Sequence, residues 1–513
     1  MTKENVLEGM HPLKRLFWPI FRSEYRKILP MIVIYSLIVF NYSLLKTAKD
    51  ALVVTAKNSG ASTIPFIQVW AIMPLAILST LIFTRLANKY SKEKVFNIMM
   101  TGFLSFFFLF AFFLYPNQDL LHPHKLADKL QSFLPSGFLG LIAVFRNWTF
   151  TLFYVMSELW GTIIMTVLFW GFANEVTSVK EAGRFYAILG LGANIATTLA
   201  GQAGIFLSGT FLYSLFSIQT DRWTFSLMLL SSIIIVIGFV ILFVYQKLNT
   251  VLRAEAPKDS CASEKKEKPK MGIRENFAYL AKSKYLICIA LVVLAFNIAL
   301  TLVEVVWKDQ VRELYPYAAD YSSYMGSVMT YIGILSIFFS IFLCGQSVRK
   351  FGWTTTAYIT PVILLISGML FFLFYLGRST PIALGIAAAF GTSPLVIITF
   401  LGAFQNCFSR ASKFTFFDVT KEMAFIPLSP ESRLKGKAAI DGVGSRLGKS
   451  GASVIHQALF VFFGTVSASA PFVAVIIILV FLGWIFAVRS LGEQFGRTKD
   501  ENTDGKEAVE QKV

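Results

Sequence analysis

Two apolar segments of this chain carry charged side chains in places where a membrane helix normally excludes them. Lys46, Lys49 and Asp50 lie in an apolar run from about residue 28 to 54, which is long enough to cross a bilayer. The second half repeats the feature in residues 302–309, LVEVVWKD. A charge at membrane depth costs roughly 3 kcal/mol on insertion scales, so it needs a partner or a water-filled cavity. The two segments therefore predict a polar path for a charged solute.

A glycine-rich segment near the C-terminus adds two more cations. Arg446 and Lys449 stand three residues apart in residues 442–451, GVGSRLGKSG, and so share one face of a helix. Two cations on one face suit a polyanion such as a phosphate chain. The segment nearly matches the P-loop pattern GxxxxGK[ST], but Val443 replaces the first glycine and no strand precedes it. A P-loop ATPase is therefore not favoured.

Four other polar residues lie in helical, apolar surroundings. Glu158 has no basic partner within one turn, so we expect it to face the cavity, pairing across helices or exchanging a proton. Tyr154, one turn earlier, could stack on a flat ring. Asn194 could bond a base or ribose, or equally another helix. Glu304 lies one turn from Lys308, and both a structural bridge and a substrate contact remain open.

A set of charges crowds the tenth apolar segment. Asp418 lies one turn from both Lys421 and Glu422, so part of the set can neutralise itself. We expect a salt-bridge gate at the cytoplasmic end rather than substrate contact. The residues assigned to gating or salt bridges are Asp50, Lys308, Asp309, Arg410, Lys413, Asp418, Lys421 and Glu422.

The composition predicts an all-α membrane protein. The 513 residues are 55% hydrophobic and 15% charged, against about 25% charged residues in a soluble protein. At about 20 apolar residues per span, there is room for about twelve helices. The net charge of +17 is concentrated in every second loop, which is the positive-inside pattern with both termini cytoplasmic. No aromatic and basic readout motif accompanies the charges, so nucleic acid is not an expected partner.

The apolar segments divide into two groups of six, and this predicts two bundles. Short basic loops at residues 85–90 and 345–352 occupy equivalent places and resemble the gating loops of major facilitator carriers. In that architecture the substrate binds near the midplane between the bundles. The predicted divisions are a cytoplasmic segment 1–29, a bundle 30–247, a cytoplasmic linker 248–283, a second bundle 284–492 and a disordered tail 493–513.

Three segments depart from a simple run of crossing helices. Residues 137–177 and 381–424 are over-long for one crossing and are expected to be tilted or bent. Residues 119–133 are either an interfacial helix on the far side or an amphipathic loop.

The four cysteines and four histidines lack metal-ligand spacing, so no metal or cofactor is expected and an enzyme is not favoured.

Several motifs together closely resemble the ATP/ADP translocase (nucleotide transporter) family of chlamydiae, rickettsiae and plastids. The resemblance runs from about residue 16 to 491. The motifs are RNWTF at 146–150, SELWG at 157–161, FWGFANE at 169–175, KGKAAID at 435–441 and GKSG at 448–451. The resemblance implies alternating-access transport that usually exchanges ATP for ADP. It assigns roles to Glu158, Glu304 and Lys449, and Lys46 and Lys49 resemble the basic residues of the family's first helix.

One departure from the family pattern bears on the substrate. Many exchangers of the family have a lysine where this chain has Gln68, in residues 64–70, IPFIQVW. The alternative is therefore a proton-coupled importer or an exchanger of other nucleotides such as GTP, UTP, CTP or NAD. A membrane ATPase and a passive channel are weaker alternatives. We expect a monomer in a bacterial inner membrane, with ATP, ADP and the lipid bilayer as partners.

Overall fold

The computed structural model describes residues 20–21, 24–216, 220–255, 283–428, 436–437, 440 and 444–510. These residues form helices and connecting turns, with no strand among them. Ten helices are long and apolar enough to cross a membrane, and there are eleven if one bent pair counts as a single span. The predicted all-helical fold is thus confirmed in the described part of the chain, where the number of spans falls just below the expected twelve.

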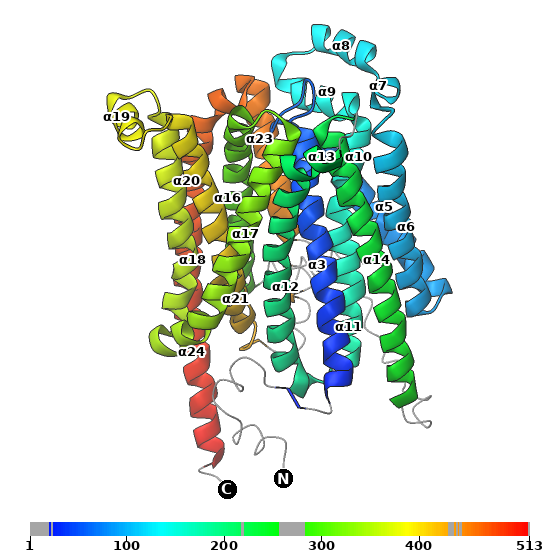
Figure 1. The fold of residues 1–513 in the computed structure, drawn as a ribbon. Coiled ribbons are helices and arrows are strands. Elements are labelled where there is room, and N and C mark those ends of the chain that lie inside the picture. The colour runs from blue at the N-terminus through cyan, green and yellow to red at the C-terminus, as the bar shows by residue number, and fades with distance from the viewer. Residues whose placement is uncertain are drawn as a thin grey trace.

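The first half of the chain contributes six long helical passages (Figure 1). Some passages are single helices, and others are α-helices continued by a π-helical stretch. In chain order they are α3 (Tyr25–Val54); α4 (Thr63–Phe66) with η2 (Ile67–Ile72) and α5 (Met73–Lys89); α6 (Lys92–Leu109) with η3 (Phe110–Leu114); α10 (Trp148–Leu159) with η5 (Trp160–Phe169) and α11 (Trp170–Val176); α12 (Val179–Ser208); and α14 (Arg222–Glu255).

The second half repeats the arrangement beside the first (Figure 1). Its passages are α16 (Lys284–Leu314); α17 (Ala318–Phe342); α18 (Cys344–Leu376); α20 (Pro394–Ser412) with η7 (Lys413–Phe417) and α21 (Asp418–Ala424); α23 (Ser445–Phe463); and α24 (Val466–Glu510). Helix α23 has 19 residues but is not among the ten apolar spans, because its first half is polar and rich in small residues. Helix α24 continues into the stretch predicted to be a tail.

Short helices cover the end of the molecule opposite the start of α3 and the end of α24 (Figure 1). We call this the far end, and the other the termini end. The far-end helices are α7 (Gln118–Leu121), α8 (His124–Phe133), η4 (Ser136–Phe138), α9 (Leu139–Arg146), α13 (Thr210–Phe216) and α19 (Pro381–Ala389). Residues 119–133 are therefore largely helical, as one of the two interpretations expected.

Both over-long segments are bent. The first breaks at Asn147, between α9 and α10, where the backbone leaves the helical region at ψ 48°. The second turns by 84° between α19 and α20, where Gly391 has a positive φ of 61° and Pro394 begins the next helix. Both bends lie at the far end (Figure 1).

The two halves pack closely through small residues on α12 and α17. A Cβ on Gly201 of α12 would lie 2.5 Å from the carbonyl oxygen of Gly326 on α17. A Cβ on Gly333 of α17 would lie 2.8 Å from the backbone nitrogen of Thr198. Such small residues let membrane helices approach to backbone contact. The α12–α17 pair is therefore a tight seam between the halves.

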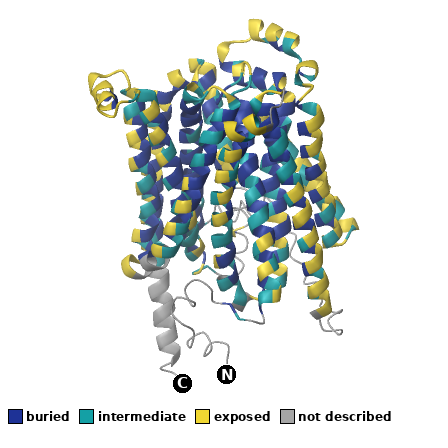
Figure 2. Ribbon diagram, viewed as in Figure 1, coloured by how far each residue is buried: buried dark blue, intermediate teal, exposed yellow. Residues whose placement is uncertain are grey.

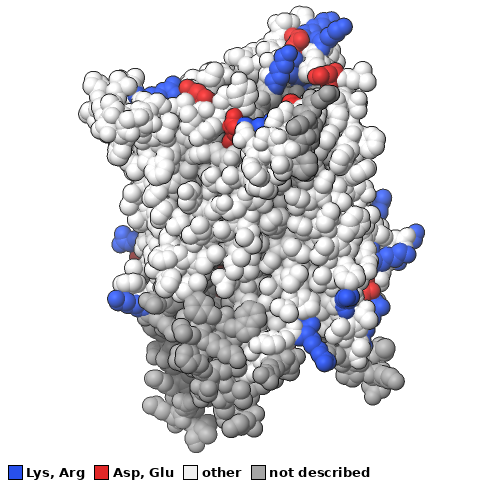
Figure 3. All heavy atoms as spheres, in the orientation of Figure 1, with Lys and Arg blue, Asp and Glu red and all other residues white. Residues whose placement is uncertain are grey.

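The surface divides into charged ends and an uncharged belt. In the view of Figure 3, charged side chains gather toward the two ends, and the band between them is almost free of charge. Buried residues face the shared interior, whereas exposed ones lie on the outer faces of the helices (Figure 2). Large apolar side chains are exposed on those faces, among them Phe243 (56%) and Phe486 (71%). A belt of this kind fits lipid rather than water.

Candidate functional site

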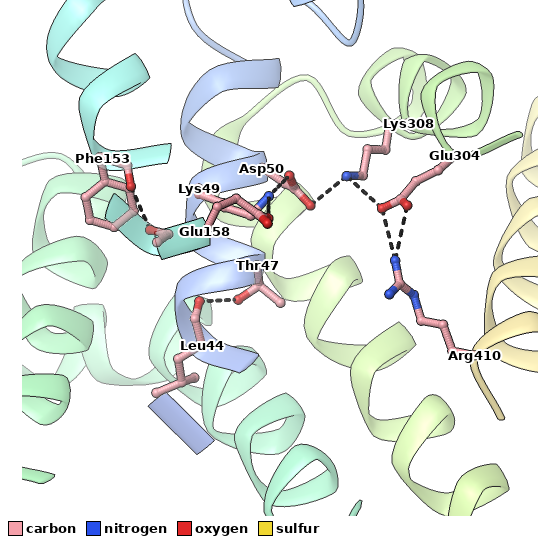
Figure 4. Close-up of polar contacts among 10 residues, drawn as sticks. Leu44, Thr47, Lys49, Asp50, Phe153, Glu158, Glu304, Lys308 and Arg410 are labelled. Atoms are coloured by element: carbon pink, nitrogen blue, oxygen red, sulfur yellow. Dashed lines mark hydrogen bonds and ion pairs between the residues drawn. The ribbon is translucent and has the colours of Figure 1, made fainter. Parts of the chain in front are cut away.

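A chain of alternating charges crosses the centre of the molecule (Figure 4). Its first half lies on α3 and α10. Lys49 Nζ is 3.1 Å from Glu158 Oε1 and 2.9 Å from Asp50 Oδ1. The same ammonium lies over the Tyr154 ring, 3.6 Å from its centroid. Both Lys49 and Asp50 are at most 2% exposed, so these contacts replace the water that the charges have lost.

The second half of the chain lies on α16 and α20 (Figure 4). Lys308 Nζ is 2.8 Å from Asp50 Oδ2, which joins the two halves of the protein, and 2.9 Å from Glu304 Oε1. Arg410 Nη2 then donates to both carboxylate oxygens of Glu304, at 3.2 and 3.1 Å. Arg410 also donates from Nε to Asn406 Oδ1 at 2.8 Å. Each carboxylate in this chain therefore has at least one close cation.

Two further lysines on the same cavity have no carboxylate partner. Among the described residues, neither Lys46 nor Lys449 forms an ion pair, and both line the central cavity. Five cations thus surround three carboxylates, which leaves two positive charges uncompensated. The cations are Lys46, Lys49, Lys308, Arg410 and Lys449, and the carboxylates are Asp50, Glu158 and Glu304. An excess of positive charge in a partly dry cavity attracts anions.

Three cavities follow one another between the halves. The central cavity is about 80 Å³. A second cavity of about 610 Å³ meets it at Tyr42, Lys46 and Arg410. A third, of about 970 Å³, shares Tyr186 and Val419 with the second and is lined by α21 residues near the termini end. Together they form a path from the central charges toward the termini end.

Contacts between the halves close the far end. Gln68 Oε1 accepts a hydrogen bond from Ser453 Oγ at 2.8 Å, and Gln457 Nε2 donates to the carbonyl oxygen of Pro65 at 2.9 Å. Farther out, Arg222 Nη1 is 2.9 Å from Asp320 Oδ1. The structure thus has the geometry of a carrier that is closed at the far end.

The tertiary structure brings most of the predicted substrate residues together. Those on the central cavity are Lys46, Lys49, Tyr154, Glu158, Glu304 and Lys449. Asn194 lines the second cavity. Arg446 is exposed and does not line the central cavity, although it is one helical turn from Lys449. Tyr154 is 2% exposed, and Lys49 occupies a face of its ring, so that face is not available for stacking on a substrate.

The predicted gate residues fall into three separate places. Asp50, Lys308 and Arg410 belong to the central charge chain, so Arg410 lies apart from the other predicted gate charges of its own segment. The reason is that Arg410 lies two turns above Asp418 on α20–α21, at the depth of Glu304. Asp309 lines a separate far-end cavity. The remaining four lie toward the termini end, where Lys413 pairs with Asp418 at 2.9 Å and Lys421 lies 3.6 Å from Glu422.

Sequence reasoning missed Tyr42, which lines both the central and the second cavity. Its spacing from Lys46 and Lys49 could have identified it, because positions 42, 46 and 49 recur at intervals of four and three and so share one face of α3. No group of three or more histidine, cysteine, aspartate or glutamate side chains that could hold a metal occurs within the described ranges. The site is therefore built from charges and aromatic rings.

An apolar belt, two packed helical halves and a buried, positively charged path between them define a membrane transporter for anions. The chain belongs to the TLC ATP/ADP transporter family, whose profile matches residues 4–495. It is 43% identical over 487 residues to ADP,ATP carrier protein 1 of Chlamydia pneumoniae, covering 94% of each chain. It is 40% identical to the chloroplastic ADP,ATP carrier protein 1 of Arabidopsis thaliana, covering 94% of this chain and 76% of the plant protein.

The fold has solved counterparts. The chain matches a crystal structure of a D-xylose-proton symporter with a TM-score of 0.50 and 12% identity, covering 88% of this chain and 97% of the other. At this identity the likeness concerns the fold alone, which is that of a major-facilitator-like transporter.

Proposed function

We propose that this protein exchanges ATP for ADP across a membrane by alternating access. The observation that carries the proposal is a pair of lysines on one cavity, Lys46 from the first half of the protein and Lys449 from the second, which form no ion pair with any described residue. A nucleotide's phosphates would bridge them, and Arg410 offers a planar fork beside them. The names of the relatives, ADP,ATP carrier proteins, support nucleotides as the anion.

The charge chain supports a physical reason for exchange. Asp50 holds Lys308 across the two halves. A phosphate group near Lys308 and Arg410 would compete with Asp50 and Glu304 for these cations, and the halves could then separate at the far end. Without an anion, separation would strand buried charges, at a cost of about 3–5 kcal/mol for a broken buried pair. The empty carrier would therefore return slowly.

We propose the bacterial inner membrane as the location, with the termini end in the cytoplasm and the protein acting as a monomer. The distribution of charge supports this orientation, since basic residues gather at the termini end of α5, α6 and α14 (Figure 3). They include Lys89, Lys92, Lys94, Lys247 and Arg253. Lysine and arginine are enriched in cytoplasmic loops.

Counterflow in proteoliposomes tests the proposed exchange. Vesicles loaded with ADP should take up labelled ATP, and vesicles loaded with buffer should not. Lys449→Ala should lose most of this uptake while the protein remains in the membrane, and Lys125→Ala, on α8 at the far end and outside the cavity, should keep it. Uptake that needs no internal nucleotide and stops with an uncoupler would contradict exchange and favour proton-coupled import. Normal uptake by Lys449→Ala would remove this lysine from the site.

A further inference from the structure

We infer that the far-end cavity is an outer anion site, where Arg312 of α16 holds the terminal phosphate of a nucleotide before the nucleotide reaches the central cavity. The inference rests on the proposed nucleotide transport and adds a second binding site to the same path. The far-end cavity has a volume of about 330 Å³ and lies between the halves. Its lining residues fall within 58–63 and 131–140 of the first half and within 309–312 and 460–467 of the second.

Neighbouring residues on two helices face the far-end cavity and the central cavity. On α4, Thr63 lines the far-end cavity and Ile64 lines the central one. On α16, Asp309 lines the far-end cavity and Lys308 lines the central one. Adjacent residues thus reach opposite sides of one barrier. Opening of the far end would therefore join the two cavities, and a nucleotide entering from that side would meet the far-end cavity first.

Arg312 extends from the second half of the protein to the first without a partner of its own. Its Nη1 lies so close to Gly60 of the first half that an added Cβ there would be 2.8 Å from it. Arg312 forms no ion pair and no hydrogen bond with any described residue. A guanidinium carries five N–H donors in a planar fork that fits a phosphate group. An unused fork in a polar cavity therefore indicates an anion as its partner.

Uncharged polar groups line the same cavity and add further donors. The side chains of Asn58, Ser62 and Ser136 make no hydrogen bond with any described residue. Hydroxyl and amide groups of this kind can donate to phosphate oxygens. Asn58 and Ser136 are exposed, so the cavity opens toward the far side of the molecule. A phosphate group can therefore reach Arg312 while the far end is closed.

Asp309 limits the strength of this outer site. Its carboxylate lines the cavity three residues before Arg312, and it forms no ion pair with any described residue. A carboxylate opposes the binding of an anion, and here it cancels the net charge of the guanidinium. Weak binding suits an outer site, because the nucleotide has to leave it for the net positive charge of the central cavity. The two opposite charges predict opposite effects of their removal.

Transport measured from each side of the membrane tests the outer site. In the proposed orientation, intact cells that express the protein offer the far end to added nucleotide, and inverted membrane vesicles offer the termini end. In cells, Arg312→Gln should raise the KM for labelled ATP about tenfold and Asp309→Asn should lower it, both at unchanged Vmax. In inverted vesicles neither variant should change the KM. Lys125→Gln removes an exposed far-end charge on α8, outside the cavity, and should keep both KM values.

Arg312→Lys separates the charge of the side chain from its shape. It keeps the charge and loses the fork, so it should raise the KM in cells by less than Arg312→Gln does. The inference is overturned if Arg312→Gln leaves the KM in cells unchanged or changes it equally on both sides. It is also overturned if Asp309→Asn raises the KM, which a purely structural role would produce. A wild-type protein that takes up no nucleotide would instead overturn the proposed function.

Discussion

Asp50 on α3 and Lys308 on α16 form an ion pair of 2.8 Å that joins the two halves of the protein at its centre. Both side chains are almost fully buried, at 0% and 2% exposed. The same carboxylate also contacts Lys49 of its own helix. A single acidic residue thus links the cation that belongs to one half with the cation that belongs to the other.

The Asp50–Lys308 pair should show strong coupling. Asp50→Asn and Lys308→Gln should each abolish most ATP uptake, because each breaks the ion pair between the halves and leaves a buried charge with one opposite charge fewer. The double variant removes both members of the pair, so its loss of melting temperature should be smaller than the sum of the single losses. Thermal unfolding in detergent measures the melting temperature of each single variant and of the double variant. Additive losses would show that the two residues do not act as a pair.

Arg410→Lys should reduce uptake despite keeping the charge. The arginine binds both oxygens of Glu304 and also the side-chain oxygen of Asn406, a geometry that a lysine ammonium cannot reproduce. We expect at least a tenfold loss of the initial uptake rate. The matched control is Arg489→Lys, which changes an exposed arginine of α24 and should leave the rate unaltered. Equal uptake rates for the two variants would argue against a role for the Arg410 guanidinium group's contacts with Glu304 and Asn406.

Gln68→Lys should change the preference between ATP and ADP. Gln68 lines the central cavity beside Lys449, so a lysine there raises the number of uncompensated positive charges from two to three. The more highly charged ATP should gain more affinity than ADP. Ser453→Ala is the control, because it removes the hydrogen bond to Gln68 without adding charge. Competition of each nucleotide against labelled ATP uptake measures the two affinities.

Gly201→Val should block assembly or movement of the α12–α17 seam. Even a single Cβ at this position would lie 2.5 Å from the carbonyl oxygen of Gly326, and a backbone atom cannot move aside cheaply. We expect loss of uptake together with a lower melting temperature. Gly102→Val on an exposed face of α6 is the control, since an added Cβ there has nothing within 4 Å. Wild-type uptake and melting temperature in Gly201→Val would show that the α12–α17 seam tolerates separation.

His122 should make the far end less stable in mild acid. Burial, with a smaller effect from neighbouring His124, lowers the pKa of His122 to about 4 from the ordinary value of 6.5. Its Nε2 lies 2.6 Å from Thr149 Oγ1 and fastens the α7–α8 turn to α10. The unfolded chain then binds more protons than the folded chain between these values, so stability falls as the pH drops from 6.5 toward 4. His122→Gln should flatten the change in melting temperature between pH 7 and 5, and His124→Gln should retain it.

The sequence by itself determined the class of the protein and much of the site. Hydropathy fixes the crossing helices, because backbone groups in lipid must bond within a helix. The cost of charge in apolar segments singled out Lys46, Lys49, Glu158 and Glu304, and helix-face spacing singled out Lys449; all five line one cavity. These inferences need only local chemistry and the spacing of residues along one helix.

Only the tertiary structure decided which charges face one another. Arg410 belongs with Glu304, 106 residues away, and not with its sequence neighbours at the termini end. Arg446 and Lys449 share a helix face by spacing, yet only Lys449 lines the central cavity. Periodicity gives the face of a helix but not its depth or its neighbours, which depend on how the two halves pack. For the same reason, Lys49 covers the ring of Tyr154 and leaves Tyr42 as the aromatic group beside both cavities.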